Sequence, residues 1–257
     1  MNLFNLFDLK HRPHEVSAKK SREEIQRQYY HDSPDNAETD RVLAKIDTFR
    51  RGREKQGVLV TSAVLGEGKS TVSTHIAMAS SRNRKSPTLL IDFDLRRPRI
   101  HHIFRQNKGP GVAEILRNKV PFYACIRNSS IANLKILTSG SLQGSPLQVI
   151  NSENVKAFLK QVYNYFDFIV VDAPPVIPVS DPLILGKVVD HVVMVVRVGE
   201  TSKRIVKRAI DMLNSVEINV SGIILNDVNN VLPTYYDYKY YGYPYYTETN
   251  SATVKSR

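Results

Sequence analysis

The sequence predicts an α/β protein in which a doubly wound, mostly parallel sheet carries helices on both faces. Short apolar runs rich in β-branched residues recur along the chain, at 58–60, 89–91, 168–171, 192–196 and 223–225. Stretches with the periodicity of amphipathic helices lie between most of them, at 71–81, 153–165 and 202–213. This alternation is typical of a parallel sheet that is buried on both faces, and the crossovers of such a sheet are right-handed.

The limits of this core pattern define the organisation of the chain. Residues 1–35 are polar with mixed charges and form an N-terminal segment, and a helix is expected at 37–50. The core pattern, and with it the domain, extends over 36–230. Residues 231–257 contain eight of the thirteen tyrosines, interrupted by proline and glycine. We expect this tyrosine-rich tail and the N-terminal segment to be flexible.

Composition limits the cellular context. The chain has 257 residues, of which 42% are hydrophobic and 24% charged, as in ordinary globular domains. The single cysteine, Cys125, excludes an internal disulfide, fits a reducing compartment, and is expected to be a small buried hydrophobe. No apolar run is long enough to cross a bilayer, and the N-terminus lacks a signal-peptide pattern. We therefore expect a cytoplasmic protein whose membrane contact is peripheral or through a partner.

Positive charge is concentrated in the middle of the chain. The net charge is +11, and residues 82–135 hold twelve Lys or Arg but only three acids, so this stretch alone carries +9. A block of one sign attracts polyanions such as nucleic acid, lipid head groups or phosphorylated peptide. A solvated basic face gives the same pattern, so both interpretations stay open on the sequence.

The most specific motif is a phosphate-binding loop (P-loop) between the strand at 58–62 and the following helix. Its residues are Gly66, Glu67, Gly68, Lys69, Ser70 and Thr71. Glycines let successive backbone N–H groups turn inward, and the helix N-terminus adds partial positive charge. Lys69 would contact the β- and γ-phosphates of ATP, and Ser70 would ligate Mg²⁺. Ala63 replaces the usual first glycine of the motif.

Two further strands end in aspartates. Asp92 and Asp94 follow the apolar run at 89–91, and Asp172 closes the run at 168–171. Ligands of open α/β sheets bind beyond the carboxyl ends of the strands, where carboxylates can bind metal or accept a proton from an attacking hydroxyl. An aspartate at a strand end can instead form a turn or cap a helix. The order of the three elements favours a nucleotide site with Asp172 at the Walker B position.

Together these residues resemble the bacterial tyrosine kinases (BY-kinases), the cytoplasmic autokinases of capsular and exopolysaccharide biosynthesis. The resemblance covers roughly 36–230 and extends to the tail. It is carried by the P-loop and by the strand ends at 92–98 and 172–175. Further matching segments are 137–140 with Pro146, 180–181, 196–197, 199–201 and 222–226.

The resemblance implies a role for each site residue. Lys69, Asp92 and Asp94 would be catalytic, with both aspartates near the incoming tyrosine hydroxyl and the metal. The implied ligands of Mg²⁺ are Ser70, Asp94 and Asp172. The implied nucleotide contacts are Gly66, Glu67, Gly68, Lys69, Ser70, Thr71 and, at the base, Asn226. ATP and Mg²⁺ are therefore the expected cofactors.

The family transfers the γ-phosphate of ATP to tyrosines in the tail of a neighbouring subunit, regulating polysaccharide polymerisation and export. The implied phosphoacceptors are Tyr235, Tyr236, Tyr238, Tyr240, Tyr241, Tyr243, Tyr245 and Tyr246. The implied partners are further copies of the chain, a membrane-spanning chain-length regulator that activates the kinase, and a tyrosine phosphatase. No nucleic acid is expected. Arginines at 96, 97, 99 and 105 follow the acidic motif and could bind the phosphorylated tail, or only neutralise the acids.

Two departures from the family bear on assembly. Ring-forming members carry Glu-x-x-Arg-x-x-Arg before the P-loop, whereas here Glu38 and Arg41 are followed by Ala44 at the third position. We expect no activator domain with membrane spans before the kinase, so the resemblance is to members whose activator is a separate chain. We expect that partner to hold the protein at the inner face of the cell membrane.

Two alternatives share the P-loop. A Par/Min-like positioning ATPase would carry a second lysine near the start of the loop, where this chain has Val64, and would lack the tyrosine array. A nucleic-acid-binding ATPase could use the basic stretch for phosphates and the aromatic tail for stacking. Only Lys239 lies among the tail tyrosines, however, whereas stacking platforms interleave cations. The missing second lysine and the tyrosine array favour the kinase over the Par/Min alternative, and the lack of interleaved cations favours it over the nucleic-acid-binding alternative.

Overall fold

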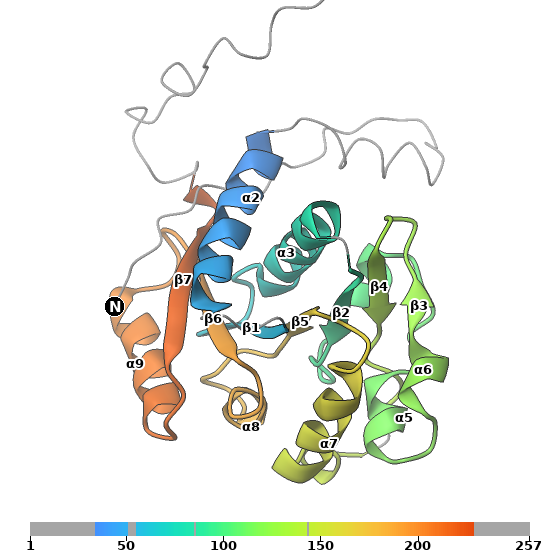
Figure 1. Cartoon of the computed structure of the whole chain (residues 1–257). Helices are drawn as coiled ribbons and strands as arrows, with labels where there is room; N and C mark the ends of the chain where they lie inside the picture. Colours follow the sequence, from blue (N-terminus) through green and yellow to red (C-terminus); the bar gives the residue numbers. More distant parts are fainter. Residues whose placement is uncertain (1–33, 51–54, 85, 143, 229–257) are drawn as a thin grey trace, which may run out of the picture.

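The computed structural model describes residues 34–50, 55–84, 86–142 and 144–228, and the expected tail and most of the N-terminal segment lie outside these ranges. The described chain contains a seven-stranded sheet of order β3-β4-β2-β5-β1-β6-β7 (Figure 1). The strands are β1 (Gln56–Ser62), β2 (Thr88–Asp92), β3 (Arg127–Asn128), β4 (Leu134–Leu137), β5 (Phe168–Asp172), β6 (His191–Arg197) and β7 (Val220–Asn226). All neighbours are parallel except β3 and β4. The predicted fold class is confirmed.

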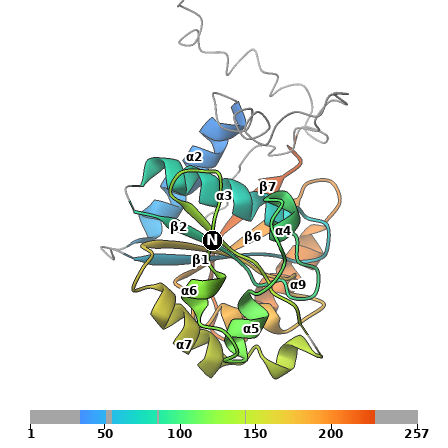
Figure 2. The ribbon, with the colours of Figure 1, turned by 90° about the vertical axis from the view of Figure 1, so that its right-hand side faces the viewer.

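Helices cover both faces of the sheet (Figures 1 and 2). The helices α2 (Pro34–Asp47), α3 (Lys69–Asn83) and α4 (Ile100–Ile103) lie on one face. The other face carries α5 (Val112–Leu116), α6 (Phe122–Cys125), α7 (Ser152–Val162), α8 (Asp181–Leu185) and α9 (Lys203–Asn214). Two 3₁₀ turns, Thr48–Arg50 and Pro146–Gln148, complete the described elements.

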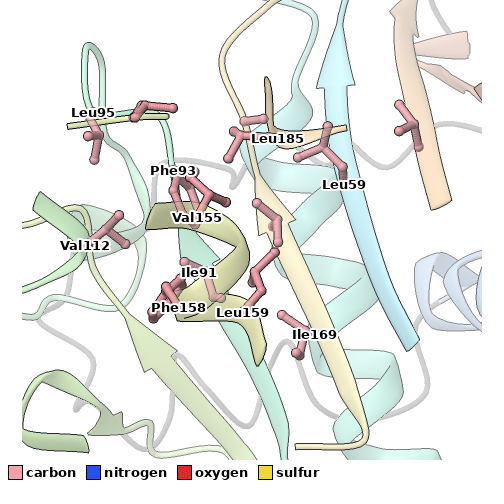
Figure 3. Packing of buried hydrophobic residues seen from close by; sticks show 14 of the residues in the cluster. Leu59, Ile91, Phe93, Leu95, Val112, Val155, Phe158, Leu159, Ile169 and Leu185 are labelled. Carbon is pink, nitrogen blue, oxygen red and sulfur yellow. The ribbon is translucent and has the colours of Figure 1, made fainter. Parts of the chain in front are cut away.

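The two faces of the sheet bury separate apolar clusters because side chains alternate along each strand. In β1, Val58 and Val60 pack with α2 and α3, while Leu59 packs on the opposite face. Figure 3 shows this second cluster, where Phe158 and Leu159 of α7 lie against the strands. Cys125 is 1% exposed within the same cluster, as predicted. Both layers therefore hold the strands in register at the edge of the sheet where the P-loop lies.

Two predicted helices differ from the observed ones in their boundaries, and two observed strands were not predicted. The helix expected at 71–81 begins at Lys69, because Gly68 adopts a left-handed conformation (φ 87°) that turns the P-loop directly into α3. The helix expected at 37–50 divides into α2 and a 3₁₀ turn. The edge strand β3 and its neighbour β4 were not predicted, since β3 has two residues and β4 only four.

Within the described ranges, no helix combines the length and apolar character that a membrane crossing requires.

Candidate active site

The P-loop is shaped by two glycines and backed by the end of β7. Gly66 and Gly68 have φ angles of 86° and 87°, in the left-handed region that favours glycine. A Cβ atom on Gly68 would lie 2.1 Å from Nδ2 of Asn226, so no side chain fits there. That same Nδ2 donates a hydrogen bond of 2.9 Å to the carbonyl oxygen of Glu67. Asn226 therefore packs against the P-loop at Gly68 and supports its backbone through the bond to Glu67.

The Glu67 side chain stabilises the P-loop by hydrogen bonds to backbone groups. Its side chain is 2% exposed, and Oε2 accepts a 2.8 Å hydrogen bond from the backbone N–H of Val64. Oε1 accepts a longer bond of 3.4 Å from the backbone N–H of Arg197, at the end of β6. The carboxylate is thus directed at the protein's own backbone, and a nucleotide contact by Glu67 would have to come from its main chain.

Lys69 and Asp94 join the P-loop to the loop after β2. Nζ of Lys69 lies 2.8 Å from Oδ2 of Asp94, and the two side chains are only 12% and 2% exposed. Burial alone would lower the pKa of Lys69, but Asp172 and Asp94 outweigh it and raise that pKa above its ordinary value. Lys69 therefore remains a cation, placed where the phosphates of a nucleotide would enter.

Asp172 closes β5 with one oxygen atom unpaired. Oδ1 accepts a 3.2 Å hydrogen bond from the Ser73 hydroxyl, whereas Oδ2 is buried and has no hydrogen-bond partner among the described residues. Burial raises the pKa of Asp172 to about 6, against the opposing effect of the Lys69 charge. An unpaired buried acceptor is costly, so this oxygen is suited to a ligand that donates to it.

Asp92 holds the loop that follows β2. The side chain is fully buried, and Oδ2 accepts hydrogen bonds of 3.1 Å from the backbone N–H groups of Arg99 and Ile100. Oδ1 accepts a third, of 3.2 Å, from the N–H of Asp94. Burial, and next the charge of Asp172, raise the pKa of Asp92 well above its ordinary value. Of the two aspartates predicted to meet the tyrosine hydroxyl, Asp92 has its carboxylate occupied by backbone.

The metal ligands predicted from the sequence are only partly brought together. Among the described residues, no group of three or more His, Cys, Asp or Glu side chains is arranged to hold an ion. Asp94 is held by Lys69, which leaves Ser70 (9% exposed) and Asp172 as the protein donors. This set fits Mg²⁺, which is bound in phosphoryl-transfer sites through one or two protein groups plus phosphates and waters. Thr71, the remaining predicted contact, is partly exposed on α3.

Several supporting residues were not predicted. Asp181, at the start of α8, is fully buried and binds Arg96 through two bonds, Nε–Oδ2 of 3.0 Å and a guanidinium NH₂–Oδ1 bond of 3.2 Å. This pair fixes the loop after β2 to the loop after β5. Ser73, which binds Asp172, could have been found from the helical spacing, since it lies three residues after Ser70 on α3. Asp181 belongs to a segment that matches the family, but its pairing with Arg96 had no comparable signal because the two residues are 85 positions apart.

The basic stretch at 82–135 does not form one surface. Arg82, Arg84 and Arg127 bond to Asp40, Asp47 and the Thr138 hydroxyl respectively, and Arg96 is committed to Asp181. Arg97 and Arg99 are exposed beside the acidic motif. Arg82, Arg84 and Arg96 therefore neutralise acids of their own chain.

Comparison with known proteins identifies the class of protein to which this chain belongs. A ParA family model, described as "NUBPL iron-transfer P-loop NTPase", matches residues 53–242. The chain therefore belongs to the ParA class of P-loop NTPases, a class of nucleotide-binding proteins. Within that class, the chain is 32% identical over 201 residues to the tyrosine-protein kinase YwqD of Bacillus subtilis, covering 78% of this chain and 84% of YwqD. The chain belongs to the bacterial tyrosine-protein kinases.

Solved structures agree with this assignment. The chimerical protein CapA2B2 superposes with a TM-score of 0.70 at 28% identity, covering 76% of this chain and 85% of that chain. A MinC:MinD cell division protein complex from Aquifex aeolicus, at 23% identity and a TM-score of 0.56, covers 66% of this chain and 68% of that chain. The second likeness shows a shared fold alone. The kinase interpretation is therefore favoured over the Par/Min alternative.

Proposed function

We propose that this chain is an ATP-dependent protein-tyrosine autokinase that transfers the γ-phosphoryl group of ATP to the tyrosines at 235–246. The main support is the meeting of Lys69, Asp94 and Asp172 at the carboxyl edge of the sheet, beside the P-loop. β7 ends at the same edge with Asn226, and Tyr235 follows it by nine positions (235 − 226). The acceptor cluster is thus tethered close to the site.

Lys69 and Asp94 would exchange partners during the reaction. The β- and γ-phosphates compete with Asp94 for the Lys69 ammonium, because phosphate oxygens carry more negative charge than one carboxylate. When Lys69 turns to the phosphates, Oδ2 of Asp94 loses its 2.8 Å cation partner. That oxygen can then accept the proton of an incoming tyrosine hydroxyl. Asp92, bound to three backbone N–H groups, would position this loop and take no part in the proton transfer.

Ser70 and Asp172 would hold Mg²⁺, Ser70 through its hydroxyl and Asp172 through the unpaired Oδ2 acting on a metal-bound water. The ion would neutralise charge that develops on the transferred phosphoryl group. Asn226 also has an unpaired buried acceptor, Oδ1, while its Nδ2 supports Glu67. An acceptor in this place suits the exocyclic amino group of adenine, so Asn226 would contact the base.

The wider assignments rest on the family. We propose transfer between copies of the chain, activation by a membrane-spanning chain-length regulator, reversal by a tyrosine phosphatase, and a role in polysaccharide polymerisation and export. Recruitment by that regulator would place the protein at the inner face of the cell membrane. The kinship with YwqD and the likeness to CapA2B2 support this proposal. Residues 36–230 would form the catalytic domain and 231–257 the acceptor tail.

The experiment is mass mapping of the full chain after incubation with ATP and Mg²⁺. Phosphate is expected on the tyrosines at 235–246, and none is expected in the Lys69→Met protein. Circular dichroism would show that the variant is folded. ATP hydrolysis without phosphotyrosine in the wild-type chain, both with and without a cytoplasmic fragment of the activating regulator, would instead support a positioning ATPase.

A further inference from the structure

Helix α9 carries a cluster of positive charge on its exposed side. The exposed cations are Lys203, Arg204, Lys207 and Arg208, and we call them the α9 basic surface. Lys207 pairs with Asp211 at 2.6 Å. In the part of the chain that the structure describes, the side chains of Lys203, Arg204 and Arg208 have no hydrogen-bond or ion-pair partner. The buried side of the helix, with Ala209, Ile210 and Leu213, faces the core.

This charge pattern opposes the stability of the helix. Lys203 with Lys207 and Arg204 with Arg208 are like charges at i,i+4 spacing, which repel each other on a helix. Cations in the first turn also oppose the helix macrodipole, and α9 has no acid there. By contrast, α5, α7 and α8 each carry an acid in their first turn. A local charge pattern that disfavours its own helix is characteristic of a binding surface.

The topology places this surface beside the point where the tail leaves the sheet. β6 and β7 are parallel neighbours, so α9 must begin near the edge where both strands end (Figure 1). The backbone N–H of Val198, shortly before α9, donates a 3.0 Å hydrogen bond to the carbonyl of Asn226. Tyr235 follows Val228, the last described residue, by seven positions (235 − 228). Such a segment spans up to about 25 Å when extended, whereas twelve helical residues span about 18 Å.

The chemistry of the surface fits phosphotyrosine. An open hollow lies along this side of the helix, lined by Arg204, Lys207, Arg208, Asp211, Met212 and Ser215. Arginine side chains bind phosphate with two parallel hydrogen bonds, and a methionine thioether makes favourable contact with an aromatic ring. Between 229 and 257 the unmodified sequence has two acids and three bases, so it has little attraction for cations. Each phosphate adds nearly two negative charges.

We propose that the phosphorylated tyrosine tail docks on the α9 basic surface, so that this helix holds the product of the kinase away from the P-loop. The proposal rests on the proposed function, because it takes the tail tyrosines to be the acceptors. Phosphorylation then changes the partner of the tail: unmodified tyrosines reach the active site, and phosphotyrosines are retained on α9.

The test uses the full chain carrying Lys69→Met, so that its own tail stays unmodified, and a synthetic peptide of residues 232–248 with phosphotyrosine at 235, 238 and 241. Fluorescence anisotropy measures binding. The unphosphorylated peptide is expected to bind at least about tenfold more weakly than the phosphopeptide. The double substitution Arg204→Glu/Arg208→Glu is expected to weaken binding of the phosphopeptide by about tenfold or more. Thermal unfolding checks the fold of this variant, and Arg204→Gln/Arg208→Gln replaces it if it does not fold.

The matched control is Lys156→Glu/Lys160→Glu on α7, which makes the same charge change at two exposed positions with the same spacing. It is expected to leave phosphopeptide binding unchanged. Equal loss in the control, equal affinity for the two peptides, or loss only with Arg97→Ala/Arg99→Ala would overturn the proposal. So would Arg204- and Arg208-dependent binding to phosphatidylglycerol vesicles without phosphopeptide binding, which would make α9 a membrane-facing surface. Because the peptide is synthetic, these outcomes are independent of whether the chain is an active kinase.

Discussion

Lys69 and Asp94 form a 2.8 Å ion pair that joins the first residue of α3 to the loop after β2. The pair links two parts of the site, because Lys69 belongs to the P-loop after β1, Asp94 belongs to the acidic motif after β2, and β5 lies between these two strands. The two side chains neutralise each other in this structure, and in the proposed mechanism a bound nucleotide would separate them.

Replacing Asp94 by Asn tests this exchange. The substitution keeps the shape of the side chain but removes the charge and the proton acceptor. We expect kcat for tail phosphorylation to fall by about 10²–10⁴-fold. Nucleotide affinity, measured with a fluorescent ADP analogue, should stay the same or rise, since Asp94 no longer competes for Lys69. Unchanged kcat would show that another group accepts the proton.

Replacing Asp172 by Asn should stabilise the protein in a pH-dependent way. The pKa of Asp172 is raised from 3.8 to about 6 by burial, so the folded state binds this proton more tightly than the unfolded state. The wild-type protein therefore loses stability as pH rises from about 4 to about 6. We expect the variant's advantage to grow over this window to at most about 3 kcal/mol and then level off.

Urea unfolding at a series of pH values measures this difference, without nucleotide or Mg²⁺. The same variant should lose kinase activity, because the metal-bound water loses its charged acceptor. A stability difference that does not vary with pH would contradict the raised pKa of Asp172.

Removing Arg96 should loosen the loop that carries Asp94. Arg96→Ala leaves the fully buried Asp181 carboxylate without its two bonds. We expect a loss of about 1–3 kcal/mol in the free energy of unfolding, together with a lower kcat. The control is Arg99→Ala, an exposed neighbour, for which a change within about 0.5 kcal/mol is expected. Equal effects of the two substitutions would argue against a role for the Arg96–Asp181 pair.

The two P-loop glycines should differ in their tolerance of alanine. Both have left-handed backbone, but a Cβ on Gly66 meets no atom within 4 Å, whereas one on Gly68 lies 2.1 Å from Asn226. Gly66→Ala should therefore cost only the backbone strain, about 1–2 kcal/mol. Gly68→Ala should cost more, and Asn226→Ala in the same chain should recover part of the loss. Chemical unfolding without ligand measures this, and equal costs for the two glycines would contradict the packing of Asn226 behind the loop.

The sequence predicted the parts of the site that lie close together along the chain. The P-loop between strand and helix, Asp92 and Asp94 after one strand, and Asp172 after another follow from local pattern alone. It could not predict which carboxylate faces which partner. Asp92 and Asp94 have the same chemistry, and only the positions of the Arg99 and Ile100 N–H groups decide that Asp92 is occupied. The Arg96–Asp181 pair depends on the docking of two distant loops, which no local pattern contains.

The fold was predictable for a similar reason. Buried parallel strands are continuous apolar runs and can be read directly, as at 168–171 and 192–196. The strand β4 is short, and the edge strand β3 is defined only by its antiparallel pairing with it. Such short strands are defined by pairing with neighbouring strands, so their own residues give little sequence signal for a strand.

The most direct test of the central claim is transfer between two full chains. The acceptor is the Lys69→Met protein, and the donor is an active chain in which the eight tail tyrosines are phenylalanine. After mixing with ATP and Mg²⁺, mass spectrometry of the separated chains should find phosphotyrosine at 235–246 of the Lys69→Met protein. Absence of phosphotyrosine from that chain, while the wild-type chain labels its own tail under the same conditions, would contradict transfer between subunits. Absence from both, with a cytoplasmic fragment of the activating regulator added, would contradict the kinase itself.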